Sequence, residues 1–119
     1  MTIISAKKKE KAVNRPSVMS SEARGQMMRT LPDWRLNDDK TRISSTWRFP
    51  DFAAAFAFMT EIASSCEALD HHPNWSNNYR TVCISLTTHD VGGLTVLDEK
   101  LAVIISSAAG QYGGKLRQS

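Results

Sequence analysis

Cysteine is scarce in this chain, because 119 residues contain two, Cys66 and Cys83. Their spacing fits neither a metal-ligand pair nor a redox pair, so both are expected to be small buried hydrophobes in a reducing compartment. Long hydrophobic runs are also lacking: the longest, residues 52–59, is far shorter than the roughly 20 residues that cross a membrane. The N-terminal residues lack the apolar core of a secretory signal. We expect a soluble cytoplasmic protein without a membrane partner, and a nuclear fraction is left open.

An excess of positive charge is confined to the N-terminal end. Residues 1–20 hold five basic side chains and one acidic side chain, whereas residues 21–119 hold ten basic and eleven acidic ones. The remainder of the chain therefore lacks the basic face that direct nucleic-acid binding requires. Residues 1–19 are predicted to be a disordered basic extension. A targeting segment or a segment for an anionic partner is the alternative.

Hydrophobic periodicity and turn residues predict one domain, residues 20–110, with the element order α-β-β-α-β-β-α. A short helix follows Ser20 or Ser21, a hairpin covers about residues 34–49, and a long helix with Asp51 as its expected N-cap runs from about 52 to 69. A second hairpin covers about residues 74–88 with its turn expected at Asn77-Asn78, and Thr95 with Asp98 forms a potential capping box for the last helix. We predict an α+β, two-layer domain with a four-stranded antiparallel sheet and helices on one face. Residues 111–119 are predicted to be a frayed C-terminal tail.

The first half of the long helix is apolar on two sides. Phe52 and Phe56 belong to the stripe predicted to face the sheet, while Ala53, Ala57 and Phe58 make the other side apolar as well. A helix that is apolar all round is normally buried on every side. The pattern therefore predicts a subunit interface along the helix from Phe52 to Leu69. In the alternative, the short N-terminal helix covers this second face within one subunit.

All three histidines lie in one short span between two carboxylates. The sequence Glu67-x-x-x-His71-His72-Pro73 is followed by His89 and Asp98. Histidine has an unperturbed pKa of about 6.5 and can both donate and accept protons near neutrality. This concentration predicts a site for general acid/base chemistry.

The spacing from Glu67 through Tyr79 to Asp98 resembles that of the pterin-4a-carbinolamine dehydratase family. Further similar positions are Trp34 and the segments 49–52, 56–60 and 86–89, and the resemblance covers roughly residues 20–108. It implies the same fold, a dimeric or tetrameric homo-oligomer and no cofactor or metal. It also implies removal of water from 4a-hydroxytetrahydrobiopterin to give quinonoid dihydropterin, in the recycling of tetrahydrobiopterin.

The resemblance also implies roles for individual residues. His71 and His89 correspond to the acid/base pair and His72 to a residue that holds the pterin, with a share in proton transfer and the division of acid and base left open. The implied substrate-binding residues also include Asp70, Thr87, Thr88 and Asp90. Glu67, at i, i+4 from His71, is expected to orient it. Asp98 is expected either to support another histidine or to cap the helix.

The sequence is compatible with a second class of function and disfavours a third. Because a vertebrate relative serves as a dimerisation cofactor of a hepatocyte homeodomain factor, the alternative is a non-catalytic dimerisation or transcriptional coactivator module using the apolar helix. A zinc hydrolase is disfavoured, because adjacent histidines rarely converge on one ion and no His-Glu-x-x-His motif occurs. Asn74 and Asp90 stand where relatives often carry glutamate, which leaves the natural pterin side chain undetermined.

Overall fold

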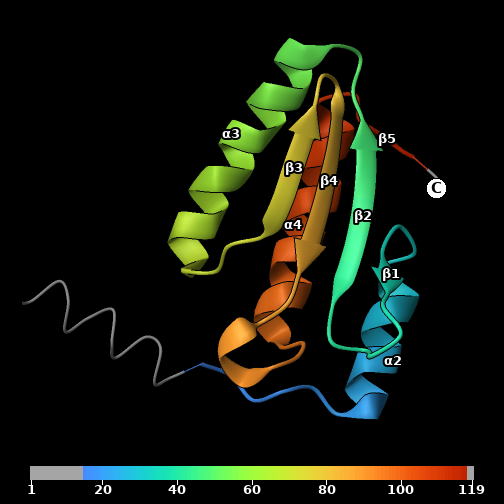
Figure 1. Cartoon of the computed structure of the whole chain (residues 1–119), viewed down its shortest axis with the longest axis vertical. Coiled ribbons are helices and arrows are strands. Elements are labelled where there is room, and N and C mark those ends of the chain that lie inside the picture. Colours follow the sequence, from blue (N-terminus) through green and yellow to red (C-terminus); the bar gives the residue numbers. More distant parts are fainter. Residues whose placement is uncertain (1–14, 118–119) are drawn as a thin grey trace, which may run out of the picture.

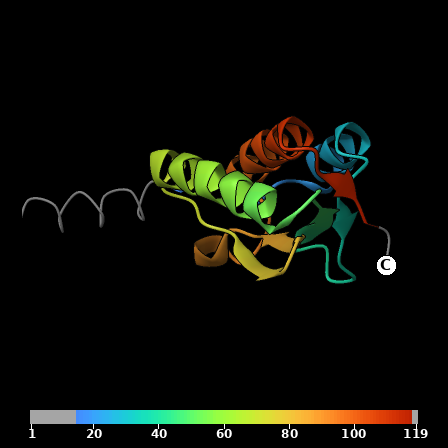
Figure 2. The same cartoon turned by 90° about the horizontal axis from the view of Figure 1, so that it is seen from above.

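The computed structural model describes residues 15–117, which form helices packed on one face of an antiparallel sheet (Figures 1 and 2). The elements are α2 (Ser21–Thr30), β1 (Arg35–Leu36), β2 (Ile43–Arg48), α3 (Phe52–Leu69), β3 (Asn74–Asn78), β4 (Thr81–Leu86), the 3₁₀ turn η1 (His89–Val91), α4 (Val96–Gln111) and β5 (Lys115–Leu116). The predicted α+β class with an antiparallel sheet is confirmed. Most of the predicted N-terminal extension lies outside the described residues.

The core lies between the helices and one face of β2 and β4. These strands pair antiparallel from Ile43 opposite Leu86 to Arg48 opposite Thr81, so alternate residues of both strands face the helices. Val82 and Ile84 are buried on that face. The other face carries small polar side chains and is exposed or partly exposed, because no helix covers it in the described part of the chain.

The second hairpin turns two residues later than the sequence suggests. Asn77 and Asn78, the predicted turn residues, remain paired with β4, and the chain reverses at Tyr79 and Arg80. Tyr79 has a left-handed backbone with φ 56°. The Asn77 side-chain amide donates to the carbonyls of Tyr79 at 3.0 Å and Thr81 at 3.1 Å, which stabilises this turn.

The C-terminal tail adds a fifth strand where fraying was predicted. Lys115 and Leu116 form β5, which pairs antiparallel with Arg48 and Trp47 at the free edge of β2. Two glycines permit this return: Gly113 has φ 77°, and a Cβ on Gly114 would lie 2.7 Å from the Phe49 ring. The sheet therefore has five strands, with β1 and β5 both paired along the same edge of β2.

Helix α3 has one face in the core and a second apolar face in solvent. The Asp51 side chain accepts the Ala54 N–H and caps its start, and Ala55, Phe58, Ile62 and Cys66 are buried. Phe52 and Phe56, which were predicted to face the sheet, are instead 45% and 56% exposed, with ring centroids 5.7 Å apart. Within residues 15–117, α3 is the helix long and apolar enough to cross a membrane by length and composition, a test that core helices also pass.

The two cysteines differ in exposure, which corrects the expectation that both are buried. Cys66 is 2% exposed, whereas Cys83 points to the open face of β4, opposite in parity to Val82 and Ile84. Burial raises the pKa of the Cys66 thiol to about 11, with the nearby Glu67 charge adding to the shift.

We expect iodoacetamide at pH 8 to modify Cys83 and to spare Cys66 in the folded protein. The thiolate is the reactive form, and Cys66 stays protonated as well as shielded at this pH. Peptide mass spectrometry should find both sites modified after denaturation. Rapid labelling of Cys66 in the folded protein would contradict its buried position. A Cys83→Ser variant measures the labelling that does not come from Cys83.

Candidate functional site

The strand register explains why histidines distant in sequence meet. His71 and His72 lie in the link from α3 to β3, and His89 follows β4. Asn74 at the start of β3 pairs with Ser85 near the end of β4. The link that enters β3 and the segment that leaves β4 therefore lie at the same end of the sheet. This antiparallel pairing brings the two histidine-bearing segments together in one site.

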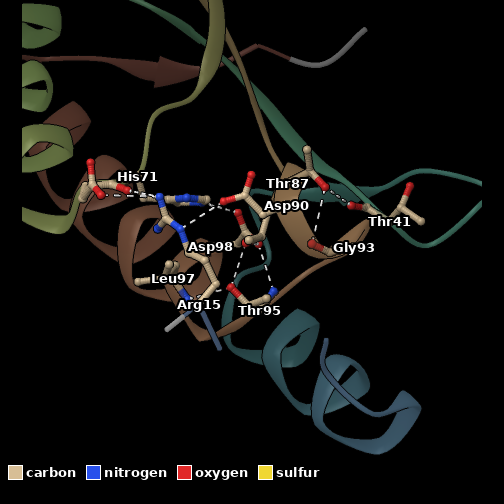
Figure 3. Close-up of polar contacts among 11 residues, drawn as sticks. Arg15, Thr41, His71, Thr87, Asp90, Gly93, Thr95, Leu97 and Asp98 are labelled. Atoms are coloured by element: carbon tan, nitrogen blue, oxygen red, sulfur yellow. Dashed lines mark hydrogen bonds and ion pairs between the residues drawn. The ribbon is translucent and has the colours of Figure 1, made fainter. Parts of the chain in front are cut away.

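A buried pair between His71 and Asp98 forms the centre of the site (Figure 3). The His71 side chain is 5% exposed and the Asp98 side chain is fully buried, and Nε2 lies 2.6 Å from Oδ1. The other carboxylate oxygen, Oδ2, accepts the Thr88 hydroxyl at 2.8 Å and the Thr95 backbone N–H at 2.9 Å. Both oxygens of Asp98 are thus satisfied, as a buried carboxylate requires.

Asp98 caps the helix, which was one of the two expected roles, but its histidine partner is His71 and not another histidine. It completes the capping box with Thr95 at the start of α4, and it also bonds to His71. The Thr88 and Thr95 hydroxyls lie 2.7 Å apart and close a buried polar network. The start of α4 and the orientation of the His71 ring therefore depend on one side chain.

This pairing fixes which His71 nitrogen is available for proton transfer. As a carboxylate, Asp98 can only accept, so Nε2 carries the hydrogen between them. In the neutral ring, Nδ1 is then the acceptor, and no residue within 15–117 forms a hydrogen bond to it. The geometry prepares His71 to take up a proton at Nδ1.

Glu67 lies against His72, not His71 as predicted. Its Oε2 is 2.7 Å from Nε2 of the exposed His72 ring. The i, i+4 rule fails here because α3 ends at Leu69 and Asp70 adopts a left-handed conformation with φ 51°. The His71 backbone N–H then donates to the Cys66 carbonyl at 3.1 Å, which directs His71 inward.

A pocket of about 220 Å³ opens beside these histidines. Of the predicted residues, His72, Thr87 and His89 line it, and the Thr87 hydroxyl is held by the Thr41 carbonyl at 2.6 Å. His71, Asp70, Thr88 and Asp90 are not among the lining residues, and His71 and Thr88 are buried. The remaining lining residues are Arg42, Pro73, Asn74 and Ser85, of which Arg42 and Ser85 were not singled out by sequence.

Arg15 joins the two segments that carry the histidines, and sequence reasoning did not find it. Its Nη2 donates to the Asp70 backbone carbonyl and lies 3.7 Å from the Asp70 carboxylate, while Nε lies 3.3 Å from the Asp90 carboxylate. The Asp90 contact is an ion pair without the alignment of a hydrogen bond. Near the same segment, the Met19 N–H donates to the Leu94 carbonyl. The basic composition of residues 1–19 predicted a disordered extension, with a targeting or anionic-partner segment as the alternative, and did not indicate these contacts.

The histidines at the site lie in separate histidine–carboxylate pairs and at the pocket. Within residues 15–117, no three His, Cys, Asp or Glu side chains converge as metal ligands. His71 and His72 each bond a separate carboxylate through Nε2. The arrangement offers two oriented imidazoles and a third, His89, at the pocket.

Sequence comparison relates the chain to known proteins. A family model described as Pterin 4 alpha carbinolamine dehydratase matches residues 17–108. A Synechococcus sp. (strain WH7803) protein named "Putative pterin-4-alpha-carbinolamine dehydratase" is 49% identical over 86 residues, covering 72% of this chain and 90% of that protein. A Bradyrhizobium sp. (strain ORS 278) protein of the same name is 46% identical over 96 residues, covering 81% and 96%.

Solved structures give the same relationship. The crystal structure of a transcriptional coactivator/pterin dehydratase from Brucella melitensis superposes with a TM-score of 0.76 at 36% identity, covering 79% of this chain and all of that one. A pterin dehydratase-like RuBisCO assembly factor of the alpha-carboxysome gives a TM-score of 0.57 at 22% identity, covering 66% and 90%. The second likeness extends to the fold alone.

Proposed function

Because the chain belongs to the pterin 4 alpha carbinolamine dehydratase family, we propose that it removes water from a 4a-hydroxytetrahydropterin. The observation that carries this proposal is the His71–Asp98 pair beside a pocket lined by His72 and His89. A role in recycling tetrahydrobiopterin after aromatic hydroxylation is part of the same proposal.

The reaction requires two proton transfers. The C4a–O bond breaks and a proton joins the departing hydroxyl, so that water leaves. The N5–H bond also breaks, and its electron pair forms the C4a=N5 double bond of the quinonoid product. One acid and one base that titrate near neutrality suit this reaction, and each such group typically contributes about 10²- to 10⁴-fold in rate.

We assign the base to His71 and the acid to His89. Asp98 holds the His71 hydrogen on Nε2, which leaves Nδ1 to take the N5 proton. His89 lies at the pocket and is the donor toward the C4a hydroxyl. His72, tethered by Glu67 at 2.7 Å, holds the pterin ring. His71 is 5% exposed and does not line the pocket, so this assignment requires that the substrate reach the Nδ1 edge of its ring.

The direct test follows the dehydration of freshly generated 4a-hydroxytetrahydrobiopterin by ultraviolet absorbance, with and without protein. Acceleration over the spontaneous rate supports the proposal, and no acceleration by folded protein refutes it. A His72→Ala variant tests the division of roles. If this variant loses as much kcat as His89→Ala while His71→Gln retains activity, the base is His72.

A second candidate is the non-catalytic dimerisation or transcriptional coactivator module, and one observation favours it. Phe52 and Phe56 form an exposed aromatic pair on α3. The Brucella neighbour is named as a transcriptional coactivator as well as a dehydratase. A stable complex with a heterologous protein through this face, together with no pterin turnover, would favour this alternative over the enzyme.

We also propose that α3 forms a homo-oligomer interface, and we expect Phe56→Glu to convert a dimer or tetramer into monomer. Burying an unpaired carboxylate at the centre of an apolar contact is strongly unfavourable. Multi-angle light scattering at micromolar concentration measures the change. Gln26→Glu on the exposed side of α2 adds the same charge and should leave the mass unchanged. A monomeric wild type, or an unchanged oligomer in Phe56→Glu, would refute this interface.

A further inference from the structure

Arg42 is the one side chain with a permanent charge among the residues that line the histidine pocket. Its backbone is fixed on both sides by Asn37: the Arg42 N–H donates to the Asn37 side-chain oxygen at 3.0 Å, and the Arg42 carbonyl accepts the Asn37 N–H at 3.0 Å. The side chain extends across the sheet to β4, where Nη1 donates to the Ser85 hydroxyl at 3.3 Å. The guanidinium is thereby directed to the pocket wall.

The charge of Arg42 is not neutralised by the protein within residues 15–117. In this part of the chain it forms no ion pair, whereas the nearby carboxylates have other partners. Asp70 and Asp90 contact Arg15, and Glu67 contacts His72. No carboxylate lines the pocket itself. The wall that Arg42 contributes is therefore positively charged.

The chemistry of a guanidinium indicates what this wall binds. Arginine keeps its charge at every physiological pH and presents five N–H donors in a planar fork. One donor is used here on a neutral hydroxyl. The others match two oxygens of a carboxylate or a phosphate, and such charge-assisted pairs are stronger than neutral hydrogen bonds.

We propose that Arg42 is a specificity residue that raises the affinity of the pocket for pterins bearing an anionic substituent, a carboxylate or a phosphate, above its affinity for neutral pterins such as tetrahydrobiopterin, which the same pocket still accepts. This inference rests on the proposed function, because it assumes that the pocket holds the pterin. A hydrogen bond from a charged group at a pocket wall typically corresponds to a preference of about 10- to 100-fold.

Two matched ligand pairs test the inference by isothermal titration calorimetry on the full chain. Neopterin and neopterin monophosphate differ by a phosphate, and 6-hydroxymethylpterin and pterin-6-carboxylate differ by the oxidation of one carbon to a carboxylate. We expect the anionic member of at least one pair to bind about tenfold or more tightly. The pair that shows the preference distinguishes a phosphate from a carboxylate, and added salt should weaken that preference.

Variants assign the preference to Arg42. Arg42→Ala should abolish the discrimination, with a much smaller loss for the neutral ligands, and Arg42→Lys should restore part of it. Arg48→Ala removes the same charge from an exposed position at the other end of β2 and should keep the full preference. Equal affinity of wild type for both members of both pairs overturns the specificity inference but leaves the dehydratase proposal standing. Failure to bind any of the four pterins also overturns the specificity inference, whereas the dehydratase proposal is refuted by the absence of acceleration in the absorbance assay.

Discussion

Replacing His89 with alanine is expected to lower the catalysed dehydration rate by about 10²- to 10⁴-fold, the usual contribution of one general acid. His89 is exposed at the pocket and makes no side-chain hydrogen bond to any residue within 15–117. Its removal should therefore change the reaction and not the fold. The measurement is kcat for 4a-hydroxytetrahydrobiopterin together with thermal unfolding of the same preparation.

Tyr79→Phe is the matched control for this experiment. Tyr79 is 65% exposed in the hairpin turn at the opposite end of β3, so loss of its hydroxyl should leave kcat and Tm unchanged. Wild-type turnover by His89→Ala would remove this residue from the mechanism. A large drop in Tm would instead show that His89 has a structural role.

Asp98→Ala is expected to lower the free energy of unfolding by about 3–5 kcal/mol, the usual cost of removing one partner of a buried, hydrogen-bonded ion pair. The change leaves the Thr88 hydroxyl, the Thr95 N–H and the His71 ring without their common acceptor. Domains of this size have total stabilities of about 5–15 kcal/mol, so such a loss is severe. Urea unfolding followed by circular dichroism measures it.

Asp98→Asn separates stability from catalysis. The amide oxygen can still accept from Thr88 and Thr95, so we expect a smaller stability loss than in Asp98→Ala. The amide nitrogen can only donate to Nε2 of His71, which moves the ring hydrogen to Nδ1 and removes the base. We therefore expect a folded variant with strongly reduced kcat.

Glu99→Gln is the control for Asp98→Asn, because it neutralises an acid in the same first turn of α4. Its effect should be limited to the helix dipole, about 0.3–1 kcal/mol, with normal turnover. If Asp98→Asn keeps wild-type kcat, His71 does not act through the tautomer that Asp98 selects, and the base must be assigned elsewhere.

Local sequence signals predicted most of the fold. Asp51 before an apolar stripe indicated the start of α3, and Thr95 with Asp98 indicated the start of α4, because capping depends on residues three positions apart. The return of the tail to β2 could not be predicted. A strand of two residues is too short to show the alternating pattern that identifies a strand, and its partner lies far away in the sequence. The pair Gly113-Gly114 was the available signal. Gly113 has a positive φ, and a side chain at Gly114 would clash with the Phe49 ring.

The candidate site was predictable as a group of residues but not as a set of pairs. The histidine spacing correctly predicted that His71, His72 and His89 belong to one site. The i, i+4 rule predicted that Glu67 contacts His71 and not His72, because the rule assumes that the helix continues to His71. Arg42 and Arg15 were missed because their contacts reach residues 43 and 55 positions away. Contacts between residues so far apart in the sequence are set by the assembled fold and leave no local signal.

The Thr95–Asp98 capping box ties the first turn of α4 to the His71 ring. Local opening of that turn would remove the Asp98 acceptor from the Thr95 N–H and from His71 in one event. A subpopulation with a frayed helix start is therefore also a subpopulation without an oriented base. Hydrogen exchange at the Thr95 amide would report the fraction of molecules competent for proton transfer, a quantity that steady-state kinetics averages away.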